Sequence, residues 1–188
     1  MKPRKEHTGE EIKMEEIRFY IREEPYGFLS NFWRSEQVFC RELSPEDKKF
    51  TYKTNEHFYQ SMKARYRSEQ EWINSAPSAY MAMIAGRNLK ADHIVRNWDM
   101  KKEEIMLHGL RMKFWNEELR LMLLWTGDAL LIENSPTDLF WGGLLPASKN
   151  MLGKLLMQVR SEARFGCYRD PEYLALPDAI TSLETWDP

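Results

Sequence analysis

Helix-start and helix-stop signals recur from Thr54 onwards and leave little length for an extended sheet. Thr54 can cap a helix expected to run to about Tyr66, because its hydroxyl can accept a free backbone N–H of the first turn. Further helices are predicted over residues 68–72 (a Ser-x-x-Glu capping box), 77–86, 99–115 and 117–126, and from a cap at Asn150 onwards. Helices are therefore expected to dominate the chain.

Short strand patterns precede and interrupt these helices. Residues 17–21 alternate between apolar and polar side chains, and residues 129–133 form a short apolar run typical of a buried strand. Residues 37–40 and 50–53 can pair as a hairpin. The fold class is therefore predicted to be α+β, a single mostly helical domain around a small β-sheet.

The length of 188 residues suits one domain. Residues 1–16 lack apolar periodicity and are expected to be a disordered extension. The domain is expected over residues 17–169, and residues 170–188 read as an acidic, proline-containing tail that Tyr173, Leu174 and Trp186 can dock.

Composition and missing motifs exclude several classes of protein. A net charge of −2 disfavours a broad basic face for nucleic acid. Motifs for dinucleotides, P-loops, elbow-type serine hydrolases and zincins do not occur, and the four His and two Cys share no ligand spacing. We therefore expect no cofactor and no metal. No apolar run is long enough for a membrane span, so a cytoplasmic protein is expected.

The helix predicted after Thr54 carries an unusual polar face. Helical spacing of i, i+3, i+4 and i+7 places four polar side chains together: Glu56, Tyr59, Gln60 and Lys63. Glu56 lies in the first turn, where the helix dipole can keep a carboxylate ionised and ready to act as a base. A solvated helix face is the alternative interpretation.

Two further segments carry candidate ligand groups. The stretch from Gly86 to Lys90 and the one from Arg96 to Asp99 gather cations before a helix start, which suits a phosphate, although a solvated basic loop fits equally. Asp138 and Trp141 follow the predicted strand at 129–133, where an acid and an indole suit a sugar hydroxyl and a flat base. An ordinary Asx turn beside a buried Trp is the alternative there.

Together these segments resemble the NADAR (NAD and ADP-ribose) family, and within it the bacterial N-glycosidases of riboflavin intermediates. The matching stretches, which run from Ile17 to about Arg164, are Tyr26–Phe32, Glu56–Gln60, Lys63–Ala64, Gly86–Arg87, Asn97–Trp98, Lys113–Phe114, Leu131–Glu133, Asp138-x-x-Trp141-Gly142 and Asn150–Arg160. One departure is the loop at residues 143–149, which is more apolar and less glycine-rich than in many relatives.

The resemblance implies a metal-independent hydrolase that cleaves the N-glycosidic bond of ribosylamino-pyrimidine phosphates and releases ribose 5-phosphate and free base. It assigns catalysis to Glu56, Lys63 and Asp138. It assigns substrate binding to Trp98 and Trp141. We also expect substrate binding by Asn31, Gln60, Gly86, Arg87 and Gly142, and by Lys149 in the departing loop. Glu56 can activate water, or Lys63 can form a transient imine with an opened ribose, and both routes remain open.

Two other functions stay open from the sequence. The same chemistry can act on ADP-ribosylated guanine in nucleic acid or a nucleotide. Alternatively, the chain can bind ADP-ribose or NAD without cleaving it, although such a module has no need for Glu56 and Lys63 on one helix face. An interaction scaffold fits less well, because it leaves the three polar segments unexplained.

Overall fold

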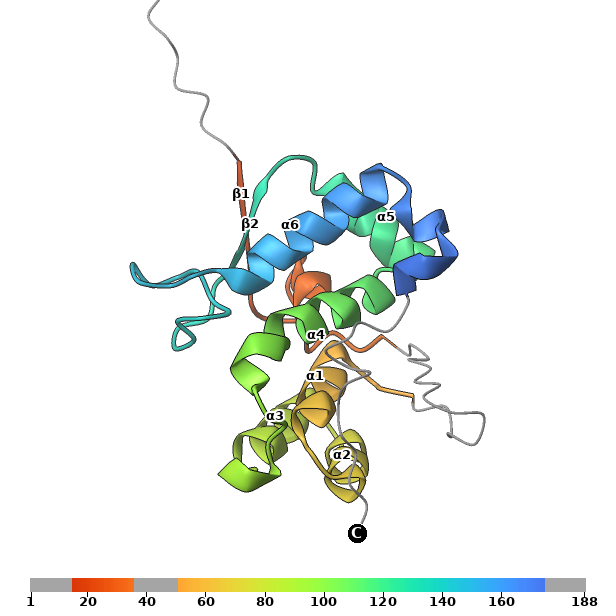
Figure 1. Ribbon diagram of the computed structural model, residues 1–188. Helices are drawn as coiled ribbons and strands as arrows, with labels where there is room; N and C mark the ends of the chain where they lie inside the picture. The colour runs from red at the N-terminus through yellow and green to blue at the C-terminus, as the bar shows by residue number, and fades with distance from the viewer. Residues whose placement is uncertain (1–14, 36–50, 175–188) are drawn as a thin grey trace, which may run out of the picture.

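A computed structural model describes residues 15–35 and 51–174, which form two groups of elements joined by one long helix (Figure 1). The elements in chain order are β1 (Glu16–Phe19), the 3-10 turn η1 (Gly27–Leu29), α1 (Asn55–Lys63), α2 (Arg67–Asn74), α3 (Ala79–Arg87), η2 (Ala91–His93), α4 (Trp98–Lys113), α5 (Glu117–Trp125), β2 (Leu130–Glu133), α6 (Met151–Arg164), η3 (Cys167–Arg169) and η4 (Pro171–Leu174). The predicted α+β class is confirmed.

The small sheet consists of β1 and β2, which run parallel with Ile17 opposite Leu131 and Phe19 opposite Glu133. A parallel pair needs a crossover connection, and here that connection contains α1 to α5. The sheet lies beside α6, which packs on α5, while α1, α2 and α3 form the other group and α4 lies between the two (Figure 1). The expected strand at residues 37–40 lies outside the described residues.

Helix α1 occupies the centre of the fold. Thr54 caps it as predicted, with its hydroxyl accepting from the backbone N–H of His57 at 3.3 Å. Every residue from Asn55 to Met62 is buried, because α2, α3 and α4 all pack against this helix. The solvated-face interpretation of its polar residues is therefore wrong. The helix ends at Lys63, three residues before the predicted end, because Ala64 takes an extended conformation and bridges to Ile94.

Several helix starts differ from the predicted capping. Ser68 lies inside α2, whose N-cap is Tyr66 and has no side-chain cap, so the predicted capping box is wrong. Ser78 caps α3 after Pro77. Helix α4 begins at Trp98 after Asn97, whose φ of 58° is left-handed.

The main core joins both groups of elements. Met106 and Leu110 on α4, and Phe114 directly after it, are almost fully buried. Lys113 on the same helix is also fully buried, and its Nζ donates to the Ser30 carbonyl oxygen at 2.7 Å. This bond fixes the segment after η1 against α4. No helix within residues 15–35 and 51–174 is both long and apolar enough to cross a membrane.

Candidate active site

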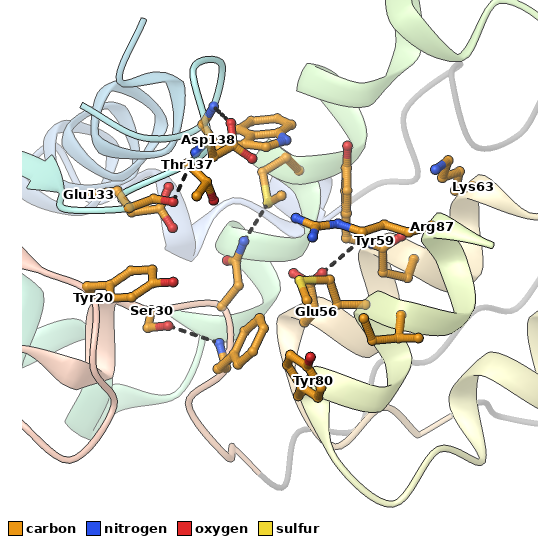
Figure 2. A pocket seen from close by; sticks show the side chains of 18 residues that line it. Tyr20, Ser30, Glu56, Tyr59, Lys63, Tyr80, Arg87, Glu133, Thr137 and Asp138 are labelled. Atoms are coloured by element: carbon orange, nitrogen blue, oxygen red, sulfur yellow. Dashed lines mark hydrogen bonds between the residues drawn. The ribbon is translucent and has the colours of Figure 1, made fainter. Parts of the chain in front are cut away.

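A cavity of about 410 Å³ lies where α1, α3, α4, the end of β2 and the loop after η1 meet (Figure 2). Its lining residues are Tyr20, Ser30, Asn31, Phe32, Glu56, Tyr59, Gln60, Lys63, Tyr80, Met83, Ile84, Arg87, Met106, Glu133, Ser135, Thr137, Asp138 and Trp141. A second cavity of about 410 Å³ adjoins it and shares the walls formed by Tyr20, Ser30, Phe32, Tyr80 and Glu133.

Glu56 is buried in the wall of this cavity, where a side chain of its own helix donates a hydrogen bond to it. The amide of Gln60, one helical turn later, donates to Glu56 Oε1 at 2.7 Å. Burial raises the pKa of Glu56 to about 7, against the opposing effects of the Gln60 bond and the positive charges of Arg87 and Lys63. We expected the helix dipole to keep this carboxylate ionised, but desolvation acts in the opposite direction, so a large share of the group carries a proton at neutral pH. A carboxyl that titrates near neutral pH can both accept and donate a proton.

Lys63 and Arg87 bring positive charge to the same cavity (Figure 2). Lys63 Nζ donates to the Gly86 carbonyl oxygen at 3.0 Å, which holds the end of α1 against α3. Burial lowers the pKa of Lys63, and the neighbouring Arg87 guanidinium lowers it further. A larger share of Lys63 is therefore a neutral amine than in water, which is the form that attacks a carbonyl.

Asp138 organises the loop that closes the cavity beyond β2. Its Oδ1 accepts from the backbone N–H groups of Phe140 at 2.8 Å and of Trp141 at 2.7 Å. Asp138 therefore forms the Asx turn through Oδ1. The same residue also lines the cavity. The Trp141 ring meets the Tyr59 ring edge-on, with centroids 5.6 Å apart, so α1 and the loop share an aromatic wall.

Four residues expected to bind substrate do not line the cavity: Trp98, Gly86, Gly142 and Lys149. Trp98 instead packs against the core with its ring 5.2 Å from that of Tyr59, because it starts α4 and turns inward. Lys149 is exposed and lies 5.0 Å from the centroid of the Phe140 ring. Neither residue therefore contacts the cavity as expected.

The two glycines act through close packing. A Cβ on Gly86 would lie 2.0 Å from Gln60 Oε1, and one on Gly142 would lie 2.5 Å from the Asp138 carbonyl oxygen. Because neither glycine has a side chain, Gln60 can lie against Gly86 and Asp138 against Gly142. The seven other predicted residues, which do line the cavity, are Asn31, Glu56, Gln60, Lys63, Arg87, Asp138 and Trp141.

The basic stretch before α4 does not form the expected phosphate cradle. Lys90 and Arg96 are exposed and absent from the cavity wall, whereas Arg87 reaches it from the last turn of α3. Among residues 15–35 and 51–174, no group of three or more His, Cys, Asp or Glu side chains is arranged to hold a metal ion.

The sequence interpretation missed several lining residues, of which Glu133 is the most notable. Glu133 ends β2, and burial raises its pKa to about 8, helped by the negative charges of Asp138 and Glu56. Its position at the end of a buried strand was the signal available in the sequence. Tyr80 on the outer face of α3 and Tyr20 after β1 carried no comparable signal.

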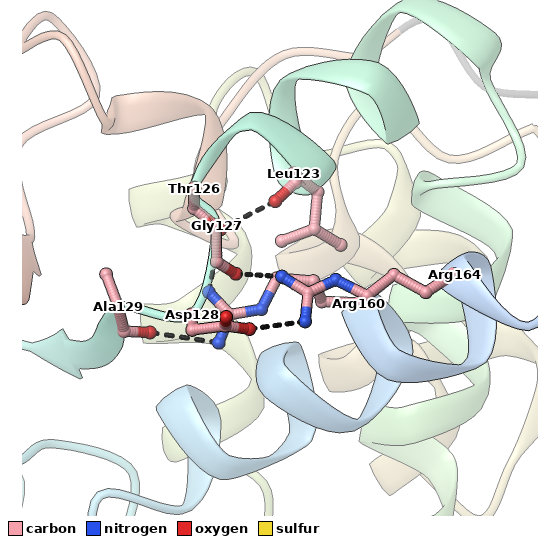
Figure 3. Close-up of polar contacts among 7 residues, drawn as sticks. All are labelled: Leu123, Thr126, Gly127, Asp128, Ala129, Arg160 and Arg164. Carbon is pink, nitrogen blue, oxygen red and sulfur yellow. Dashed lines mark hydrogen bonds and ion pairs between the residues drawn. The ribbon is translucent and has the colours of Figure 1, made fainter.

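Arginines on α6 hold the turn that leads into β2 and therefore support the end of the strand (Figure 3). Arg160 donates to Thr126 Oγ1 at 2.8 Å and to the Ala129 carbonyl oxygen at 2.9 Å. Arg164 pairs with Asp128 and also donates to the carbonyl oxygen of Gly127.

At the other end of β2, Asn150 accepts from the Glu133 N–H at 3.1 Å and donates to the Leu131 carbonyl oxygen at 2.8 Å.

Comparison with known proteins identifies the family of this site. The model of the NADAR domain matches residues 18–164. The chain belongs to the NADAR family. This match covers the segments that build the cavity, from the strand β1 to the helix α6.

Curated relatives carry enzyme names. N-glycosidase Npun_R5314 of Nostoc punctiforme is 38% identical over 156 residues, which cover 79% of this chain and 92% of the relative. The NMR structure of Escherichia coli YbiA has a TM-score of 0.71 and 32% identity, and the match covers 83% of this chain and 89% of that chain. The chloroplastic riboflavin biosynthesis protein PYRR of Zea mays is 35% identical over 78% of this chain and 25% of its own length.

Proposed function

We propose that this chain is an N-glycosidase that hydrolyses ribosylamino-pyrimidine phosphates into ribose 5-phosphate and a free base. The observation that carries the proposal is the meeting of Glu56 and Lys63 from α1 with Asp138 from the loop after β2 in one cavity. Family membership and relatives named N-glycosidases support the same class of reaction. The relative named as a riboflavin biosynthesis protein supports the choice of substrate.

Cationic and acidic side chains line different parts of the cavity, and this arrangement suits a substrate with a phosphate at one end. Lys63 and Arg87 come from α1 and α3, and Arg87 reaches towards the Glu56 carboxyl, where a phosphate would be attracted (Figure 2). Glu133 stands across the cavity at the end of β2. A ribose phosphate held by the cations would present its anomeric carbon to the Glu56 carboxyl.

In the first route, Glu56 acts as a general base. Cleavage of the bond between C1 and the base nitrogen leaves positive charge on the ribose ring, and a nearby carboxylate stabilises that charge. Glu56 takes a proton from the attacking water, whose oxygen bonds to C1. The departing base leaves with the electron pair of the broken bond and takes up the proton that Glu56 gives back. Asp138 Oδ2 is available for a ribose hydroxyl, because Oδ1 is occupied by backbone donors.

In the second route, the ribose ring opens so that C1 is joined to the base nitrogen as an imine. The Lys63 amine adds to C1, the bond between C1 and the base nitrogen breaks, and the base leaves as a free amine with the proton given up by Lys63. Water then hydrolyses the resulting imine between Lys63 and C1 and releases the sugar. The lowered pKa of Lys63 favours the addition to C1. Borohydride added during turnover separates the routes. A stable adduct between the protein and the sugar at Lys63 identifies the imine, and full turnover without any adduct identifies direct attack by water.

Chromatographic detection of released base tests the proposed function. Purified protein is incubated separately with a ribosylamino-pyrimidine phosphate and with ADP-ribosylated guanine in DNA. We expect release from the first substrate and little from the second. Release only from the DNA substrate would reassign the substrate, and tight binding of ADP-ribose in calorimetry without any product would replace the enzyme by a binding module.

A further inference from the structure

Glu133 is a cavity residue with an unmet hydrogen-bonding capacity. Glu133 is half-buried and lines the cavity, and its Oε2 is a buried atom with no hydrogen-bond partner among the described residues. Its backbone, in contrast, is fully engaged, since the N–H donates to Asn150 and the carbonyl oxygen accepts from Gly143. Buried polar atoms in folded proteins nearly always have partners, so an orphaned one at a cavity wall indicates a place for a ligand.

The position of Glu133 separates it from the cationic side of the cavity. The carboxyl projects from the end of β2 near Tyr20 and Ser30, whereas Lys63 and Arg87 approach from α1 and α3 (Figure 2). Glu133 also lines the second cavity, together with Tyr20 and Tyr80. A ligand whose phosphate occupies the cationic side would therefore extend its other end towards this carboxyl and these two rings.

The chemistry of the carboxyl limits what it can pair with. Burial raises the pKa of Glu133 to about 8, so the group is largely protonated at neutral pH. A protonated carboxyl offers one O–H donor beside one C=O acceptor. The complementary partner has a neighbouring acceptor and donor, as in the N–H and C=O of a cyclic amide in a pyrimidinone or purinone ring.

We propose that Glu133 is a specificity-determining residue that pairs, as a neutral carboxyl group, with a cyclic amide edge of the substrate's heterocycle. This inference rests on the proposed function and specifies which heterocycles the site accepts. Rings that lack an N–H beside a carbonyl leave Oε2 without a partner and are rejected. The second cavity accommodates the outer substituents of the ring, between Tyr20 and Tyr80.

Binding of free heterocycles tests this role without relying on turnover. Titrations of the full chain at pH 7, followed by protein NMR, give Kd for 4-pyrimidinone and for 4-methoxypyrimidine, which lacks the N–H donor. The wild type is expected to bind 4-pyrimidinone about 10-fold more tightly than the methoxy compound, since a lost pair of hydrogen bonds amounts to roughly this factor.

Two substitutions separate hydrogen bonding from charge. Glu133→Gln retains a donor and an acceptor and is expected to keep Kd for 4-pyrimidinone within about 3-fold, whereas Glu133→Met retains the size and is expected to weaken it about 10-fold. Thermal unfolding and the NMR spectrum of each variant check that it folds. The proposal is overturned if the wild type does not bind 4-pyrimidinone, if Glu133→Met binds it normally, or if Glu133→Gln is as weak as Glu133→Met.

These results are distinguishable from a failure of the proposed function. If no ribosylated substrate yields free base, the glycosidase assignment fails, while the pattern of pyrimidinone binding still reports on Glu133. If base is released but binding does not depend on Glu133, the glycosidase assignment stands and the role of Glu133 is wrong.

Discussion

Glu56 illustrates how burial outweighs a local helix effect at a single residue. Its place in the first turn of α1 predicted an ionised carboxylate, yet full enclosure by neighbouring helices raises its pKa to about 7. The sequence could identify the residue and its helix face. The sequence could not give the protonation state of Glu56, because that state depends on how deeply α2, α3 and α4 cover α1.

This protonation predicts the pH dependence of the reaction. If deprotonated Glu56 is the base, kcat/KM rises with pH through a midpoint near 7. Replacing Gln60 by Leu removes a donor that favours the charged form, so the pKa of Glu56 increases and the midpoint moves to higher pH. A pH profile of base release measures both. As a control, Gln158→Leu on the exposed face of α6 should leave the midpoint unchanged.

At the scale of elements, the predicted helices match the structure better than the predicted caps do. Apolar spacing found α4 and α6 because it reports directly on a buried helix face. Asn150 does precede α6 as predicted, but its side chain bonds to β2 instead of the helix N-terminus. Sequence cannot separate these two uses of an Asn, because the difference lies in a strand 17 residues away.

The contact between Asn150 and β2 gives a stability prediction. Asn150→Ala leaves the Glu133 N–H and the Leu131 carbonyl oxygen without partners and places Ala at a φ of 51°, so the free energy of unfolding should fall by about 2–4 kcal/mol. Asn150→Gly tolerates that φ and should lose less. Chemical denaturation measures both, and equal stability of Asn150→Ala and the wild type would contradict the assigned contact.

The close packing of α1 and α3 gives a second prediction. Gly86→Ala forces Gln60 away from its position, which should cost about 1–3 kcal/mol of stability and also reduce kcat/KM, because Gln60 holds Glu56. Gly127→Ala is the matched control, since its φ of 58° makes it strained although its Cβ meets nothing within 4 Å. It should lose stability and keep kcat/KM. Identical kinetics of Gly86→Ala and the wild type would argue against this coupling.

At the scale of the whole molecule, the site depends on residues that tertiary packing brings together. Three segments were singled out in the sequence, and each contributes at least one side chain to the cavity: Glu56 and Lys63, Arg87, and Asp138 and Trp141. Trp98 lies outside the lining and packs against Tyr59, because a Trp at a helix start can turn towards the core or the cavity with the same local sequence. Tyr20 and Tyr80 were missed because only the packing of β1 and α3 makes them neighbours of one cavity.

The last described residues pack against α6 and Trp115, which do not line the cavity. Tyr173 donates to Glu162 at 3.0 Å and stacks on Trp115 with ring centroids 6.4 Å apart. Tyr173→Ala should therefore lower the free energy of unfolding by about 1–2 kcal/mol while leaving kcat/KM unchanged. Thermal unfolding measures the expected loss of stability, and the base-release assay measures kcat/KM. A loss of kcat/KM in a folded Tyr173→Ala protein would contradict the claim that this contact does not affect the cavity.

The most direct test of the account is the rate of base release from a ribosylamino-pyrimidine phosphate by the wild type and by Glu56→Gln. The substitution keeps the size of a buried side chain and removes its ability to take a proton, so the rate should fall at least about 100-fold with an unchanged thermal unfolding profile. Near-normal release of base by a folded Glu56→Gln protein would contradict the central claim that this cavity is the catalytic centre and Glu56 its acid–base group.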